Sequence, residues 1–316
     1  MKKFALALCA LLAAFLAPHF AARLRAQERR PGKIEVQTDL VDILASVIDA
    51  HGQPVADLKQ DQFELSEEGV PQKIERFEAE TNRPLDLALM VDASASTFKD
   101  LKFESEAAAH FIRQVVRPDD RLAVFEFDED VTELAPFSDN VPQLQAAVRR
   151  LIPGAGTSIY DALVLGSNAL RHRPQGRRRA IVLVTDAGET TSVAKFEDAR
   201  RAAINSEALL YSIVIRPIKS ESGRNTAGEH ALITITDSTG GAMFILDELN
   251  QLDAMFDRID RELRTQYLLG YYPNPVPPAG SYRTVEVKVK TGDTVRFRKG
   301  YFTAGEGFRP FTPPQN

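Results

Sequence analysis

The chain has 316 residues, of which 39 are Lys or Arg and 44 are Asp or Glu, and 44% of its residues are hydrophobic. This composition is typical of a globular protein of about two domains, and it excludes a disordered chain or one dominated by membrane helices. The acidic balance excludes a fold-wide basic face of the kind that binds nucleic acid. The single cysteine, Cys9, lies near the N-terminus, so the rest of the chain has no disulfide, thiolate zinc site or cysteine nucleophile.

The first 26 residues have the order of a secretory signal: a basic start, an apolar run over residues 4–17, and small residues before Gln27. The run is shorter than the ~20 residues that cross a bilayer, so cleavage is expected rather than an uncleaved anchor. Cys9 lies inside the run and not at its end, so lipidation is not expected. We therefore predict an exported protein, periplasmic or extracellular, with no stable membrane span after cleavage. Loss of the leader leaves 35 basic against 44 acidic residues, a net charge of −9.

The segment over residues 33–83 alternates short β-like runs with turn signals. Strands are predicted over residues 40–49, 63–65 and 73–77. The turn at residues 67–69 predicts a hairpin, with 73–77 as its return strand.

Residues 84–266 alternate strands with helices, which indicates an α/β domain with a mostly parallel sheet and helices on both faces. The runs at 85–91 and 180–185 are apolar enough to be buried on both faces. The other expected strands are 122–127, 209–215 and 243–246, and the expected helices are 101–116, 141–151, 159–170, 196–204, 229–236 and 249–263.

From residue 267 the pattern returns to β, with strands expected over 267–272, 282–289 and 295–301. Neither flank is large enough to bury a good core by itself. We therefore expect residues 267–304 to pair with 33–83 in one small β domain, into which the α/β domain is inserted. Two independent β appendages are the alternative. Residues 305–316 are predicted to form a tail.

The richest cluster of polar side chains follows the first buried strand, at Asp92, Ser94 and Ser96. Residues two apart in an extended segment point to the same side, so these three can present their oxygens to one point. That point lies at the carboxyl edge of the sheet, where open α/β sheets place their ligand sites.

Two further oxygen donors follow at corresponding places, Thr157 in a glycine-rich loop and Asp186 after the second buried strand. Two carboxylates and three hydroxyls from three loops make an all-oxygen site. This donor set suits Mg²⁺, with Mn²⁺ as a possible substitute.

The motif Asp92-x-Ser94-x-Ser96, followed by Thr157 and then Asp186, resembles the metal ion-dependent adhesion site of von Willebrand factor type A domains. The resemblance covers the whole α/β region and implies a Rossmann-like fold. It implies that the three hydroxyls bind the ion directly, that the two carboxylates act mainly through water, and that an acidic residue of a protein partner completes the shell. An ion with few anionic ligands stays electrophilic, which favours an external carboxylate.

One departure from the family pattern is Ala187, where the family often has glycine; this puts the conformation of that loop in question. The flanks are similar to those of secreted bacterial "VWFA-related domain" proteins. That similarity rests on residues 52–55, 63–65, 68–74 and 298–301.

Three other charged features have plainer interpretations. Asp128-Glu129-Asp130 lacks calcium-loop spacing and is expected to be a solvated acidic turn rather than an auxiliary Ca²⁺ site. Glu189 either tunes the charge of the site or is an exposed loop acid. The basic residues over 171–173 and 177–179 are expected in a solvated loop at the opposite edge of the sheet, with an anionic contact as the minority alternative.

Nucleotide binding and serine-nucleophile chemistry find no support in the motifs. The glycine-rich loop before Thr157 has no lysine and lacks P-loop spacing, and no G-x-G-x-x-G follows the first strand. None of His51, His110, His172 and His230 belongs to a motif that ties it to Ser94.

The sequence thus predicts a non-enzymatic, exported adhesion or interaction module that captures an acidic partner residue through Mg²⁺. An envelope assembly or scaffold protein with a structural metal is the alternative, and a metal-dependent hydrolase is a third. The helix at 249–263 runs almost directly into the strand at 267–272, so movement of that helix could couple the metal site to the β domain.

Overall fold

The computed structural model describes residues 40–79, 83–95, 97, 100–216 and 225–304, all within one compact unit. The predicted leader and tail lie outside these residues, and so does the predicted site residue Ser96. None of the described helices combines the length and apolar character needed to cross a bilayer.

The central sheet of the α/β domain has six strands in the order β10-β9-β8-β5-β6-β7. Its first five strands in this order are parallel, and β7 pairs antiparallel with β6 at the edge. Every residue of β5, β8 and β9 is buried, which explains their continuous apolar runs. The strands are β5 (Leu85–Asp92), β6 (Arg121–Phe127), β7 (Val131–Ser138), β8 (Arg178–Thr185), β9 (Leu209–Ile215) and β10 (Ala242–Leu246).

Strand β7 was not among the expected elements. It contains Pro136, is only partly buried and pairs with β6 through register shifts. Proline removes a backbone donor and is confined to edge strands, so this segment lacks the usual strand signature.

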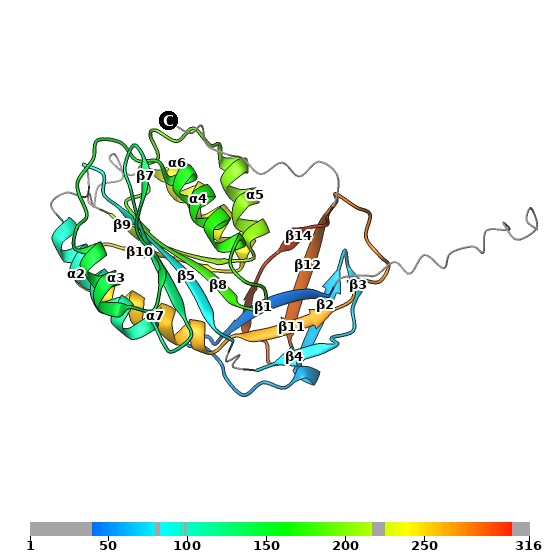
Figure 1. Cartoon of the computed structure of the whole chain (residues 1–316). Helices are drawn as coiled ribbons and strands as arrows, with labels where there is room; N and C mark the ends of the chain where they lie inside the picture. Colours follow the sequence, from blue (N-terminus) through cyan, green and yellow to red (C-terminus); the bar gives the residue numbers. More distant parts are fainter. Residues whose placement is uncertain (1–39, 80–82, 96, 98–99, 217–224, 305–316) are drawn as a thin grey trace, which may run out of the picture. The chain divides into compact units, whose positions relative to one another are not determined.

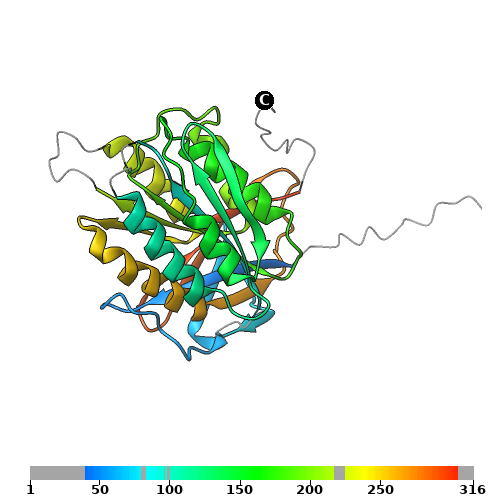
Figure 2. The ribbon, with the colours of Figure 1, turned by 60° about the vertical axis from the view of Figure 1, so that its left-hand side comes forward.

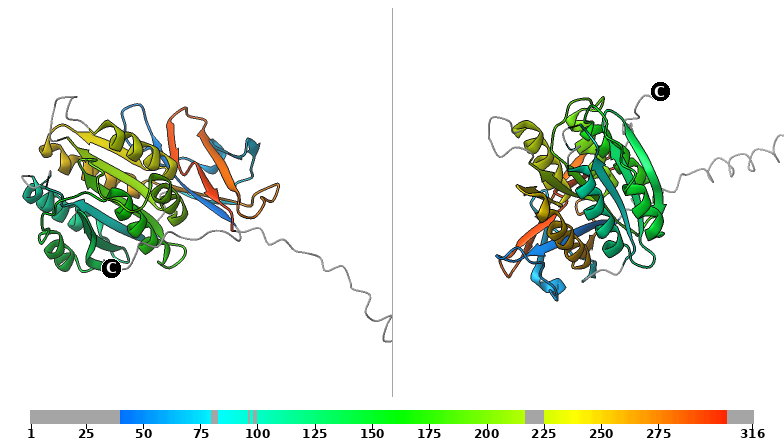
Figure 3. Two further views of the ribbon diagram at one scale, coloured as in Figure 1. Left: turned by 90° about the horizontal axis from the view of Figure 1, so that it is seen from above. Right: turned by 90° about the vertical axis from the view of Figure 1, so that its left-hand side faces the viewer.

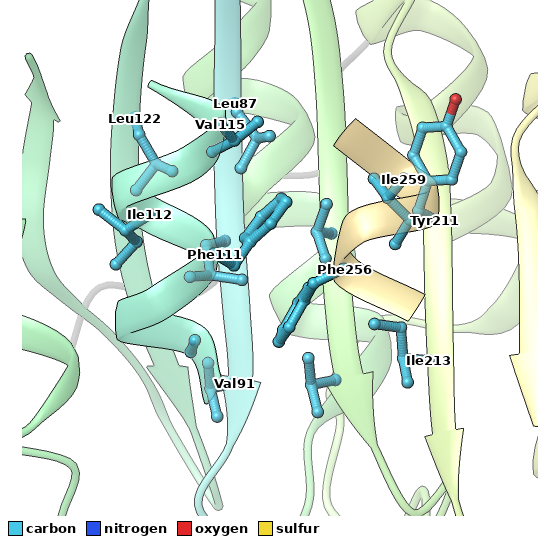
Figure 4. Packing of buried hydrophobic residues seen from close by; sticks show 14 of the residues in the cluster. Leu87, Val91, Phe111, Ile112, Val115, Leu122, Tyr211, Ile213, Phe256 and Ile259 are labelled. Carbon is cyan, nitrogen blue, oxygen red and sulfur yellow. The ribbon is translucent and has the colours of Figure 1, made fainter. Parts of the chain in front are cut away.

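Helices cover both faces of the central sheet (Figure 1). Helices α4, α5 and α6 pack on one face, and α2, α3 and α7 on the other, with α2 beside α7 (Figure 2). The rings of Phe111 and Phe256 stack between α2 and α7 with centroids 4.5 Å apart (Figure 4). The helices are α2 (Leu101–Val115), α3 (Val141–Val148), α4 (Ile159–Arg171), α5 (Phe196–Ser206), α6 (Thr226–Thr239) and α7 (Leu252–Arg264).

The two flanks form two antiparallel four-stranded sheets, β13-β1-β11-β4 and β14-β12-β2-β3. Each sheet contains strands from both ends of the chain: β1 pairs with β11, and β2 pairs with β12 (Figure 3). The predicted fold class, an α/β domain inserted in a β domain built from both flanks, is therefore confirmed, and the alternative of two independent appendages is wrong. The strands are β1 (Val41–Ile48), β2 (Phe63–Glu67), β3 (Val70–Pro71), β4 (Arg76–Glu78), β11 (Tyr267–Tyr271), β12 (Tyr282–Val289), β13 (Thr294–Phe297) and β14 (Gly300–Phe302).

Two predicted strands of the β domain differ from the observed ones. The hairpin turn at Glu68 and Gly69, both with positive φ, returns through β3, whereas β4 pairs with β11 in the other sheet. The predicted strand 295–301 is divided at Arg298 and Lys299 into β13 and β14, which belong to different sheets. The break occurs where Lys299 donates its backbone N–H to the carbonyl of Ser238 in the α/β domain.

The β domain encloses one buried carboxylate, Glu67, with only 1% of its surface exposed. Its Oε2 accepts hydrogen bonds from the hydroxyls of Tyr271 (2.7 Å) and Tyr301 (2.9 Å), and its Oε1 accepts one from Arg283 Nε (2.8 Å). Glu67 belongs to the N-terminal flank and its three partners to the C-terminal flank. The network therefore joins the two halves of the β domain.

The basic stretch around the start of β8 lies at the expected edge of the sheet but is only partly a solvated loop: His172 and residues 174–176 are exposed, whereas its arginines are partly or fully buried. Arg173 and Arg177 bind the fully buried Asp86, with Nε–Oδ2 distances of 3.1 and 2.8 Å. Arg178 and Arg179 are buried as well. The expectation of solvation is therefore wrong for these four arginines, because their side chains satisfy buried acceptors at this edge.

Arg178 binds both connections between the two domains. Its Nε donates to the carbonyl of Arg83 (2.8 Å) before β5, and its Nη1 donates to the carbonyl of Leu263 near the end of α7. Only Thr265 and Gln266 separate α7 from β11. Coupling between α7 and the β domain stays a prediction.

Candidate metal site

Asp92 ends β5 at the carboxyl edge of the central sheet, and Ser94 follows it. The loop after β5 is joined to the glycine-rich loop by a parallel bridge between Ser94 and Gly154, in which Gly154 N donates to the carbonyl of Ala93 (2.8 Å). This bridge brings the segment that carries Asp92 and Ser94 next to the segment that carries Thr157.

Asp92 is a buried carboxylate held by donors on both sides. Its Oδ1 accepts from the backbone N–H of Ser94 (2.9 Å), and its Oδ2 accepts from the hydroxyl of Thr185 (2.6 Å). Burial raises the pKa of Asp92 to about 6, although the hydrogen bonds from Thr185 and Ser94 oppose this shift and the nearby charge of Asp186 adds to it. A cation at this edge would favour the ionised form of Asp92.

Thr157 is buried and is tied to the loop after β8. Its N–H donates to Thr190 Oγ1 (2.9 Å), and its carbonyl accepts from the N–H groups of Thr190 (2.9 Å) and Thr191 (3.2 Å). A Cβ on Gly156 would lie 2.6 Å from Thr191 Cγ2, so glycine is needed for the two loops to approach this closely. Hydrogen bonds thus join the loop after β5, the glycine-rich loop and the loop after β8 at one edge of the sheet.

Asp186 follows β8 and is only partly buried. Its Oδ1 accepts the N–H of Gly188 (2.9 Å), in a tight turn through Ala187. Ala187 has φ = 65°, the left-handed conformation that favours glycine. The chain thus adopts the turn despite the alanine, at a conformational cost of about 1 kcal/mol.

The structure therefore places Asp92, Ser94, Thr157 and Asp186 at the same edge of the sheet, in segments that bind one another. Within the described ranges, no three or more His, Cys, Asp or Glu side chains form a group that could hold a metal ion. An ion here would depend on hydroxyl ligands as well as carboxylates. The donors present fit a hard cation such as Mg²⁺, for which oxygen is the preferred ligand.

A further carboxylate near this site, Glu104, was not predicted from the sequence. It lies in the first turn of α2 with 2% of its surface exposed, and its Oε2 has no hydrogen-bond partner. Burial raises its pKa to about 8, and the charges of Asp92, Asp100 and Asp186 add to the shift. Glu104 is therefore largely protonated at neutral pH when no cation is bound.

The other acidic residues near the edge have structural contacts. Glu189 accepts hydrogen bonds from the backbone N–H groups of Tyr160 (3.2 Å) and Ser192 (2.9 Å), so it fixes the loop after β8 to the start of α4. Asp128 and Asp130 close their own turn through paired hydrogen bonds of 2.9 Å. Asp128 and Asp130 thus form the expected acidic turn. Glu189 stabilises a loop, a role different from both predicted ones, tuning the charge of the site or being an exposed loop acid.

The first turn of α6 packs against the loop that follows Asp186. A Cβ on Gly228 would lie 2.0 Å from the carbonyl oxygen of Ala187. Gly228→Ala is therefore expected to displace that loop and to lower the free energy of unfolding by about 1–3 kcal/mol, measured by denaturant titration.

Gly166→Ala is the matched control for Gly228→Ala, because Gly166 is also helical. The added methyl would meet only the flexible thioether of Met90, at 2.8 Å. Gly166→Ala should cost less, because a side-chain tip can move aside whereas the backbone carbonyl that faces Gly228 cannot. The gain in helix propensity, about 1 kcal/mol, is common to both variants. Equal stability of wild type and Gly228→Ala would show that the loop after Asp186 is not held in place by α6.

The sequence and the structure were each similar to known proteins. Residues 87–189 match the family model of the von Willebrand factor type A domain. A solved von Willebrand factor type A protein from Catenulispora acidiphila aligns with a TM-score of 0.51 and 12% identity, covering 84% of this chain and 74% of that chain. No curated protein matches the sequence.

Two other solved structures align with part of the chain. The vWF domain of the type V pili tip protein Mfa5 from Porphyromonas gingivalis gives a TM-score of 0.46 at 13% identity, covering 57% of this chain and 95% of that chain. The conserved hypothetical protein BatB from Bacteroides thetaiotaomicron gives a TM-score of 0.45 at 15% identity, covering 57% of this chain and 100% of that chain.

Proposed function

Because residues 87–189 match the family model of the von Willebrand factor type A domain, we propose that the chain is an exported protein-interaction module. In this proposal the domain holds Mg²⁺ at the carboxyl edge of its sheet and captures an acidic side chain of a partner protein, without chemical turnover. The observation that carries the proposal is the convergence of Asp92, Ser94, Thr157 and Asp186 from three cross-linked loops.

Each of these residues has a defined part in the proposed site. Ser94 and Thr157, together with Ser96, would supply neutral hydroxyl ligands, while Asp92 and Asp186 would hold the ion mainly through water. When bound, the ion supplies positive charge and an open coordination position. Since few anionic ligands neutralise it, that position favours a carboxylate from outside the chain.

Calorimetric titration of EDTA-stripped protein with Mg²⁺ and with Mn²⁺ tests the site. We expect saturable binding of one ion, weakened about 10–100-fold or more in an Asp92→Ala, Ser94→Ala double variant. The matched control is Asp130→Asn, which removes an exposed acid from a neighbouring loop at the same edge and should leave the affinity nearly unchanged. A folded wild type that binds neither ion would overturn the metal-dependent proposal.

Water-proton relaxation of the Mn²⁺-loaded protein separates capture from a purely structural metal. A capture site leaves the ion a replaceable water, whereas a structural site is closed by the protein itself. We expect a relaxation enhancement that falls when a Glu-containing peptide is added and does not fall with the corresponding Gln peptide. Absence of an exchangeable water would instead favour the scaffold alternative.

A further inference from the structure

A second candidate site lies at the opposite edge of the central sheet, between the two domains. A cavity of about 180 Å³ is lined there by the start of β8, by β1 and β11 of the β domain, and by the residues that follow β13. Its volume is below the ~300 Å³ at which ordinary small-molecule pockets begin. Only a compact ligand fits.

The lining of this cavity carries an excess of positive charge. It contains five arginines and two acids, Asp42 and Glu207. Two of the arginines also pair with acids outside the lining, Arg177 with Asp86 and Arg83 with Glu78, so four acids face five arginines. The arginines are Arg83, Arg177, Arg178, Arg179 and Arg298. Glu207 is largely exposed and pairs with both Arg179 and Arg298, at 3.8 and 3.2 Å, so a single acid serves two guanidinium groups.

One buried arginine of the cavity lining, Arg179, is not fully satisfied. Arg179 is 8% exposed and its Nε has no hydrogen-bond partner, although its two terminal nitrogens bind the carbonyls of Ser206 and Arg173. Burial lowers the pKa of Arg178 to about 10, with Arg264 adding to the shift, and burial also lowers the pKa of Arg179. Within the described residues Arg178 forms no ion pair, and Arg179 and Arg298 share one carboxylate, so the positive charge of these three is only partly balanced.

We propose that this cavity binds a small oxyanion of the size and charge of phosphate, held between Arg179 of the α/β domain and Arg298 of the β domain, which both pair with Glu207. Guanidinium groups suit this ligand because their planar donors match the oxygens of phosphate and carboxylate. Such an ion would supply the missing negative charge and would bridge the two domains. The proposal is independent of the metal site, which lies at the other end of β8.

Calorimetric titration with inorganic phosphate at constant ionic strength tests this proposal. We expect one saturable site, which Arg298→Gln weakens about tenfold or more because a charge-assisted contact is lost. Glu207→Gln removes a competing carboxylate at an exposed position, so it should tighten phosphate binding and should fold normally. Because the two variants are expected to change the phosphate affinity in opposite directions, Glu207→Gln alone can test the proposal if Arg298→Gln proves unstable.

Three controls separate a site from general salt effects. Phosphate and sulfate stabilise folded proteins without binding, and that effect rises without saturation. Arg150→Gln removes an exposed arginine outside the cavity lining and should leave phosphate affinity unchanged. Sulfate, an oxyanion of similar size and charge, should compete with phosphate. A non-saturable effect that is equal in wild type, Arg298→Gln and Glu207→Gln would overturn the proposal.

Discussion

Replacing Glu67 with alanine is expected to lower the free energy of unfolding by about 3–5 kcal/mol, the cost typical of breaking a buried ion pair from one side. The substitution would leave the guanidinium of Arg283 and the hydroxyls of Tyr271 and Tyr301 without their shared acceptor. Tyr271 is fully buried and Arg283 and Tyr301 are partly buried, and a buried donor that loses its partner carries the desolvation penalty. Chemical denaturation followed by circular dichroism measures this loss.

The same strand supplies the control for Glu67→Ala. Glu64 lies three residues earlier in β2 and its side chain is exposed. Glu64→Ala should therefore change the stability by less than about 0.5 kcal/mol. Similar losses for both variants would show that the buried network does not hold the two flanks together.

Without metal, the protein is expected to become less stable as the pH rises from about 5 to about 8, because of Glu104. An ordinary glutamate loses its proton near pH 4.5, whereas burial raises the pKa of Glu104 to about 8. Between these values the folded state binds more protons than the unfolded state, so the free energy of unfolding falls with pH. At roughly 1.4 kcal/mol for each unit, the loss is of the order of 4 kcal/mol.

Glu104→Gln tests this expectation, since glutamine cannot ionise. The variant should lack this component of the pH profile, and in EDTA at pH 8 it should be more stable than the wild type. Glu106→Gln is the control: this neighbour on α2 is exposed and pairs with Arg149, which holds the pKa of Glu106 below its usual value. Equal slopes for wild type and Glu104→Gln between pH 5 and 8 would contradict the buried position of this carboxylate.

Much of the fold follows from features that are local in the sequence. The apolar runs of β5 and β8 could only belong to strands buried on both faces, and the oxygen donors after them mark the carboxyl edge of the sheet. The pairing of the two flanks was predicted from their size, because neither flank is long enough to bury a hydrophobic core alone. These inferences needed no knowledge of side-chain contacts.

The features that the sequence did not predict depend on contacts between distant residues. Glu104 looks like an ordinary first-turn acid of a helix, and only packing shows that it is buried. The burial of the basic stretch did have a signal in the sequence: Asp86 is a charged residue inside an apolar strand, and a buried charge needs partners. The presence of Asp86 in this strand therefore indicates that basic residues lie next to it in the fold.

The insertion of one domain into another also sets the order in which the chain can fold. The strands of the central sheet pair only with one another, so the α/β domain can form from a continuous stretch of chain. The β domain cannot, because contacts such as that between Leu58 and Tyr267 join residues 209 positions apart. During synthesis β1 and β2 emerge long before β11 and β12, and they must wait with unpaired edges. The β domain is thus the last part to close, and its early strands are the segments most exposed to aggregation in an incomplete chain.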